Sequence, residues 1–210
     1  MKRHFSIKIY SILIIALLFS ARGKAQIVYT DVNPDSVSSG VYNLDLNNDA
    51  TTDFIISQTV GSPICTHNTH YIRISPTGNN EVLTNSTPYV YKLSSNTVID
   101  TSTNFWSNNA NQTMLYYHWQ TLMCPGGAYA GQGNWLNAVN GYLGLKLFVN
   151  NIPYCGWALL NTSSSASSGI TTFTIQGYAY NSIPGEQIAA GEIGCNLPTP
   201  IITPSGSTTL

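Results

Sequence analysis

Residues 141–149 read Gly-Tyr-Leu-Gly-Leu-Lys-Leu-Phe-Val, and residues 154–160 read Tyr-Cys-Gly-Trp-Ala-Leu-Leu. In an extended chain, one face of the first segment carries Leu143, Leu145, Leu147 and Val149, and the other carries Tyr142, Lys146 and Phe148. Asn150-Asn151 between the segments suits a tight turn, because asparagine tolerates a positive φ. The pattern predicts a β-hairpin.

Short segments of the same kind recur along the chain, and no window has the apolar period of a useful helix. Strands are expected over 27–32, 41–46, 53–59, 70–75, 88–93 and 170–180. The polar stretches 94–113 and 124–140 are expected to be long surface loops. Many short antiparallel strands without helices predict an all-β fold, an antiparallel β-sandwich with long polar loops.

The two ends of the chain differ from the middle. Residues 1–25 have a basic start, an apolar run over 9–19 and small residues before Gln26, which together predict a secretory signal peptide. The apolar run is shorter than the ~20 residues that span a bilayer, so no membrane insertion is expected after cleavage. One β-sandwich domain is expected over 26–195, and the Pro/Ser/Thr-rich residues 196–210 are interpreted as a linker or a truncated tail.

Cleavage would also change the charge of the protein. The chain has eight basic and nine acidic residues, and the signal peptide contains five of the basic ones. Arg73, Lys92 and Lys146 then remain, and the net charge becomes −6. Such a surface argues against nucleic acid or anionic lipid as a partner.

All four cysteines follow the expected signal peptide: Cys65, Cys124, Cys155 and Cys195. An even number of cysteines in an exported domain favours disulfides over free thiols. Three connectivities are possible, and the sequence does not choose among them.

The chain contains one acidic loop, Asp45-Leu-Asn-Asn-Asp-Ala-Thr-Thr-Asp53. Calcium prefers several hard oxygen ligands, and such a loop offers them at alternate positions. The predicted calcium ligands are Asp45, Asn47, Asp49, Thr51 and Asp53. The loop is not an EF-hand, because Ala50 replaces the usual glycine and Ile56 the usual bidentate glutamate. It resembles the shorter calcium loops of integrin-type and thrombospondin-type extracellular repeats. The alternative interpretation is a solvated acidic turn.

Three other kinds of site are weaker. The aromatic residues Trp106, Trp119 and Trp135 lie in or beside the polar stretches and could stack on a glycan, although core packing is the simpler alternative. Cys65, His67 and His70 could form a soft-metal site with His118 and Cys124. No carboxylate pair outside the acidic loop, and no Gly-x-Ser-x-Gly motif, points to a hydrolase, so no enzyme activity is expected.

The motifs at 141–148 and 154–160, together with Ile-Gln-Gly-Tyr-Ala-Tyr-Asn-Ser-Ile-Pro-Gly at 175–185, resemble a pattern in uncharacterised secreted bacterial proteins. Those proteins often carry a carboxyl-terminal surface-sorting signal. The resemblance covers most of residues 27–191 and implies placement outside the cell rather than a chemistry. Cys155 stands where the pattern has tyrosine, which implies a disulfide particular to this chain, with Cys195 as its partner.

These observations predict a secreted or cell-surface protein with a calcium-binding structural or surface-associated role. The alternative is a carbohydrate-binding module that uses the loop aromatics. Its partners would be an extracellular glycan or a surface protein.

Overall fold

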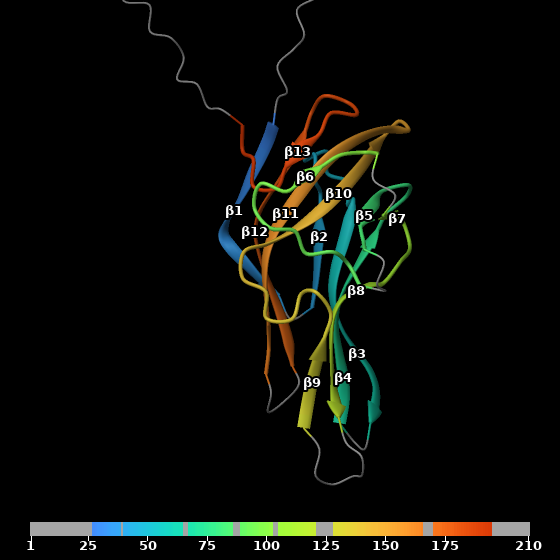
Figure 1. The fold of residues 1–210 in the computed structure, drawn as a ribbon, viewed down its shortest axis with the longest axis vertical. Coiled ribbons are helices and arrows are strands. Elements are labelled where there is room, and N and C mark those ends of the chain that lie inside the picture. Colours follow the sequence, from blue (N-terminus) through green and yellow to red (C-terminus); the bar gives the residue numbers. More distant parts are fainter. Residues whose placement is uncertain are drawn as a thin grey trace, which may run out of the picture.

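The computed structural model describes residues 27–38, 40–64, 67–85, 89–102, 105–120, 128–165 and 170–194 (Figure 1). These residues form thirteen β-strands and no helix. Within the described ranges, no helix has the length and apolar character needed to cross a membrane.

Two antiparallel sheets pack face to face, which confirms the predicted β-sandwich. The six-stranded sheet has the order β1-β12-β11-β10-β5-β7, and the five-stranded sheet has the order β2-β3-β4-β8-β9. The strands of the first sheet are β1 (Ile27–Ser38), β12 (Thr171–Asn181), β11 (Ile152–Ser164), β10 (Gly141–Val149), β5 (Glu81–Leu83) and β7 (Trp106–Ser107). Those of the second are β2 (Val41–Leu44), β3 (Phe54–Ile64), β4 (His67–Pro76), β8 (Gln112–Gln120) and β9 (Ala128–Gln132).

The hairpin predicted at residues 141–160 is the centre of the six-stranded sheet. Strands β10 and β11 pair antiparallel from Gly141 opposite Leu160 to Val149 opposite Ile152. The turn residues Asn150 and Asn151 have φ of 53° and 64°, as expected of a hairpin turn. The alternation of β10 therefore sends its leucines toward the five-stranded sheet.

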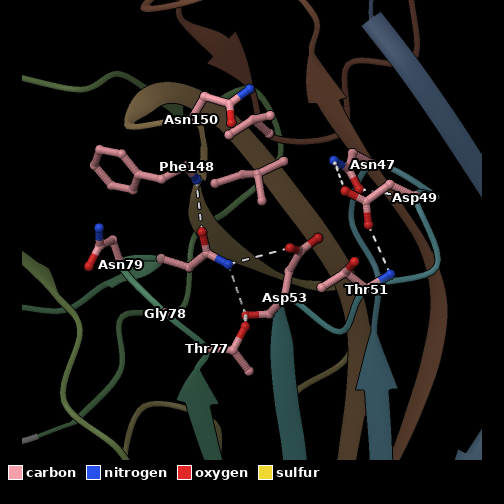
Figure 2. A pocket seen from close by; sticks show the side chains of 12 residues that line it. Asn47, Asp49, Thr51, Asp53, Thr77, Gly78, Asn79, Phe148 and Asn150 are labelled. Atoms are coloured by element: carbon pink, nitrogen blue, oxygen red, sulfur yellow. Dashed lines mark hydrogen bonds between the residues drawn. The ribbon is translucent and has the colours of Figure 1, made fainter.

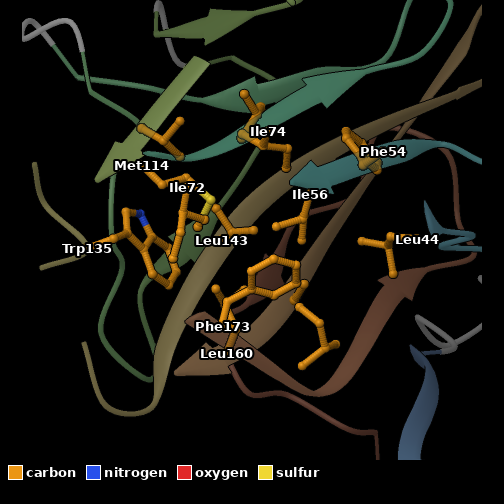
Figure 3. Packing of buried hydrophobic residues seen from close by; sticks show 14 of the residues in the cluster. Leu44, Phe54, Ile56, Ile72, Ile74, Met114, Trp135, Leu143, Leu160 and Phe173 are labelled. Atoms are coloured by element: carbon orange, nitrogen blue, oxygen red, sulfur yellow. The ribbon is translucent and has the colours of Figure 1, made fainter. Parts of the chain in front are cut away.

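The main core lies between the two sheets (Figure 3). The six-stranded sheet contributes Leu143, Leu160 and Phe173 to this core. Ile56 and Ile72 of the five-stranded sheet face them. Each of these side chains is at most 1% exposed. Burial of this apolar area is what holds the sheets together.

A second, smaller core covers the opposite face of the six-stranded sheet. There β13 (Ile188–Ala189) pairs with β6 (Val98–Ile99) as a short separate sheet. Ile99 and Ile188 pack with Cys155 and Trp157 of β11 in one buried cluster. Strand β11 is therefore apolar on both faces, because both of its faces are covered.

The stretches 94–113 and 124–140, expected to be long surface loops, are only in part loops. These stretches contain β6, β7, β9 and the start of β8. Strand β8 lies inside the five-stranded sheet, between β4 and β9. Conversely, the described part of the strand expected over 88–93, residues 89–93, forms only single bridges, at Tyr89, Val90 and Leu93. Residues 107–111 before β8 are rich in Asn and Ser, and this polarity hid the start of a strand whose burial comes from distant partners.

The expected disulfide at Cys155 is also wrong, because Cys155 is a free cysteine. Its side chain is fully buried in the second core among apolar residues such as Leu83 and Trp157. Burial raises the pKa of the Cys155 thiol to about 11. The other three cysteines, Cys65, Cys124 and Cys195, lie outside the described residues. The same holds for the predicted signal peptide over 1–25 and for the tail over 196–210.

This environment predicts that Cys155 resists alkylation in the folded protein, because the thiolate is the reacting form and little thiolate exists at neutral pH. We expect iodoacetamide to label Cys155 only after denaturation. Peptide mapping by mass spectrometry, with and without guanidinium, measures this directly. Rapid labelling of the native protein at pH 7.5 would contradict the buried position.

Candidate functional site

The acidic loop connects β2 to β3, and Figure 2 shows its side chains Asn47, Asp49, Thr51 and Asp53. The N–H of Asp53 donates to the carbonyl of Leu44 at 2.8 Å and closes the loop. Leu46 and Phe54 are buried at its two ends. Ala50 has a φ of 67°, the left-handed conformation that glycine adopts in comparable loops. The loop therefore keeps the sharp turn even though its sequence lacks the glycine.

Asp45 shapes the loop from inside. Its carboxylate accepts a hydrogen bond from the N–H of Asp49 at 3.1 Å and another from the N–H of Ala50 at 2.7 Å. These bonds satisfy two backbone donors in the turn. Asp45 does not line the adjoining pocket, so the structure places it as a loop-shaping residue.

The other four predicted ligands share one pocket. Asn47, Asp49, Thr51 and Asp53 line a cavity of about 280 Å³ at the surface (Figure 2). The opposite side of this cavity comes from the β4–β5 turn over 77–80 and from the end of β10 over 147–150. Alternate spacing in the sequence thus brings four oxygen-bearing side chains to one hollow.

Asp49 and Asp53 have different electrostatic environments. Asp49 accepts hydrogen bonds from the Asn47 amide at 3.0 Å and from the Thr51 N–H at 2.8 Å, which lower the pKa of its carboxyl. Asp53 is only 5% exposed, and burial raises its pKa. The N–H of Leu46 donates to Asp53 at 2.8 Å and opposes that rise, while the charges of Asp49 and Asp45 add to it. A cation in the pocket would favour the ionised form of Asp53.

Asn80 is a site residue that the sequence analysis missed. It is 5% exposed, and its amide donates to the backbone carbonyl of Asp53 at 3.2 Å and to the Asp53 carboxylate at 3.4 Å. Its own carbonyl accepts from the N–H of Phe148 at 2.8 Å (Figure 2). Asn80 therefore connects the acidic loop with β10 of the other sheet. One more asparagine in an asparagine-rich chain gives no sequence signal for this role.

Asn48 attaches the loop to a second region of the six-stranded sheet. Its amide donates to Thr30 Oγ1 at 2.9 Å, and its carbonyl accepts from the hydroxyl of Tyr178 at 2.9 Å. Thr30 lies on β1 and Tyr178 on β12. Asn48 thus ties the loop between two strands of the five-stranded sheet to two strands of the six-stranded sheet.

Within the described ranges, no three Asp, Glu, His or Cys side chains gather in a way that could hold a metal ion. Ligation in the pocket would therefore combine the carboxylates of Asp49 and Asp53 with neutral oxygens. The side chains of Asn47 and Thr51 supply such oxygens, which are ordinary calcium ligands.

The soft-metal site considered from the sequence does not assemble from its described members. His70 shares a hydrogen bond of 3.3 Å with Gln58, and burial lowers its pKa. His70 precedes the inward-facing Ile72 by two residues, whereas His118 stacks on Tyr116 on the other face of the same sheet. Cys65 and Cys124 lie outside the described residues.

The three predicted binding tryptophans do not form one surface. Trp135 is fully buried in the main core, so its prediction as a glycan contact is wrong. Trp106 is half-buried, with its N–H donating to the carbonyl of Asp100 at 3.0 Å and with Lys146 Nζ 4.5 Å from its ring centre. Trp119 lies on β8, and its side chain is outside the described part of the structure.

Comparisons of the chain with protein-family models, with curated proteins and with solved structures found no match.

Proposed function

We propose that this chain is a secreted structural or surface-associated module that binds calcium in the pocket beside the β2–β3 loop. The observation that carries the proposal is the convergence of Asn47, Asp49, Thr51 and Asp53 on one cavity. The signal-peptide pattern of residues 1–25 supports export, where calcium is abundant.

Asp49 and Asp53 would supply the charge for the ion, and Asn47 and Thr51 would supply neutral oxygens. Calcium takes six to eight oxygen ligands, so water or a partner's oxygens would complete the shell from the open side of the pocket. Asp45 would keep its bonds to the loop backbone and hold the turn in shape.

The role of the ion would be structural. It would neutralise two carboxylates that otherwise repel each other, one of them nearly buried. Through Asn80 and Asn48, a more rigid loop would stiffen the contact between the two sheets. No His, Cys, Ser or Lys side chain lines the pocket, and both of its carboxylates are assigned to the ion, which favours a structural role over catalysis.

The proposal predicts that calcium raises the melting temperature of the protein. At a calcium concentration 100 times the dissociation constant, linkage gives about 2.7 kcal/mol of added stability. Differential scanning calorimetry in calcium and in chelator would measure the shift. Asp49→Ala should remove most of it, because Asp49 is the more exposed charged ligand and its loss leaves the core intact.

The matched control is Asp35→Ala, which removes the same charge from an exposed position on β1. We expect it to keep the full calcium shift. Each variant is compared with its own chelated sample, so a general loss of stability does not enter the result. An unchanged melting temperature of the wild type in saturating calcium would refute the site.

A further inference from the structure

Four side chains stack in a row on the outer face of the five-stranded sheet. The guanidinium of Arg73 lies 3.9 Å from the ring centre of Tyr71. Tyr71 stacks on Tyr116 with ring centres 5.3 Å apart, and Tyr116 stacks on His118 at 4.4 Å. The intervening residues of β4 and β8, such as Ile72 and Tyr117, point into the main core, so this row faces outward.

A hollow of about 290 Å³ opens beside this row and is lined by Tyr71, Tyr89, Thr113 and Tyr116. Arg73 adjoins two of these lining residues, because it is the cross-strand partner of Thr113 and its guanidinium lies over the Tyr71 ring. Each of the four lining residues carries a hydroxyl group. Tyr89 donates its hydroxyl proton to Gln132 Oε1 at 3.0 Å, so its oxygen is free to accept.

The face is positively charged on an otherwise acidic protein. The strands β2, β3, β4, β8 and β9 contain no Asp, Glu or Lys, and Arg73 is their one arginine. Among the described residues Arg73 forms no ion pair, and its Nε is buried without a hydrogen-bond partner. His118 is 8% exposed, and its Nδ1 is also buried without a partner. Buried polar atoms of this kind call for a ligand or water.

We propose that this hollow binds a carboxylate-bearing sugar unit of an acidic polysaccharide, with the carboxylate on Arg73. Aromatic ring edges carry partial positive charge and favour an anion, and the surrounding hydroxyls match the hydroxyls of a sugar. The guanidinium provides the planar donors that a carboxylate takes up best.

Two other occupants fit this face less well. A neutral sugar stacks on the flat face of an aromatic ring, but the faces in this row are occupied by Arg73, Tyr71, Tyr116 and His118 themselves. An acidic peptide added as a strand needs a free sheet edge, and β4 and β8 are both paired on two sides.

The aromatic side of the hollow is ordered before any ligand binds. Gly61 on β3 lies under the Tyr71 ring, and a Cβ on Gly61 would lie 2.8 Å from Tyr71 Cε2. Tyr71 is therefore fixed between Gly61, Arg73 and Tyr116, which lowers the ordering cost of binding.

The test is isothermal titration of the full chain with oligogalacturonate and with its methyl ester, which has the same sugar skeleton without the charge. Both titrations are run in chelator, so that the calcium pocket does not contribute. We expect binding of the acid form and about tenfold weaker binding of the ester, as for a lost charge-assisted hydrogen bond. Alginate and hyaluronan oligomers are titrated in parallel as further carboxylated sugars.

Arg73→Gln should weaken binding of the acid form to the affinity that the wild type has for the ester. Arg73→Lys should keep part of the wild-type affinity for the acid form. Tyr89→Phe removes one hydroxyl from the lining of the hollow, together with its exposed hydrogen bond to Gln132, and should weaken binding with little change in the melting temperature. Lys92→Gln is the matched control. It removes the same charge from a side chain that packs near Gly141 of the six-stranded sheet. Failure of all three acidic sugars to bind, or wild-type binding by Arg73→Gln, would overturn the proposal. If polyglutamate bound as tightly as the acidic sugars, the assignment of the ligand as a sugar would be overturned.

Discussion

Trp135→Ala is expected to lower the free energy of unfolding by about 3–5 kcal/mol, the usual cost of emptying a large aromatic site in a core. Trp135 is fully buried among the residues of the main core (Figure 3). Its ring also lies close to β10, where a Cβ on Gly141 would be 2.7 Å from it. Its carbonyl accepts hydrogen bonds from the hydroxyl of Thr162 and from the N–H of Ala138. Guanidinium denaturation followed by circular dichroism measures the loss.

The matched control is Val139→Ala in the same segment. Val139 is 72% exposed, so its truncation should change stability by less than about 0.5 kcal/mol. A loss of under 1 kcal/mol for Trp135→Ala would contradict its core position. That result would restore Trp135 as a candidate surface residue.

Trp135 also shows why part of the fold escaped sequence reasoning. The hairpin at 141–160 was predictable because alternation of apolar residues is a local signal, and both strands carry it. Trp135 and β8 are surrounded by Asn, Gly and Gln, so the local pattern indicates a loop. Their burial is decided by strands far away in the sequence, such as β4, which pairs with β8. Local periodicity contains no information about that pairing.

The candidate calcium site divides in the same way. Alternate spacing of oxygen-bearing residues predicted that 47, 49, 51 and 53 would lie together, because all four belong to one short loop. Asn80 reaches the loop from the β4–β5 turn, and no local motif marks it. The sequence also could not separate Asp45, which bonds the loop backbone, from the residues that line the pocket. Both distinctions depend on the three-dimensional closure of the loop.

Glu81→Gln is expected to destabilise the protein by about 2 kcal/mol, because it removes the counter-ion of a nearly buried lysine. Lys146 Nζ lies 2.7 Å from Glu81 Oε2 across the β5–β10 pair, and the two side chains are 9% and 25% exposed. The expected loss is below the 3–5 kcal/mol typical of a fully buried pair, since water still reaches Glu81. Chemical denaturation at pH 7 measures it.

The double variant Glu81→Gln/Lys146→Met separates the ion pair from its burial cost. Methionine leaves no charge in the site and can pack against the Trp106 ring, over which Lys146 Nζ lies in the wild type. We therefore expect the double variant to recover most of the stability that Glu81→Gln loses. If it is instead less stable than the single variant, the lysine stem and its contact with Trp106 contribute more than the charge costs. The buried charge would then be a stabilising part of the second core.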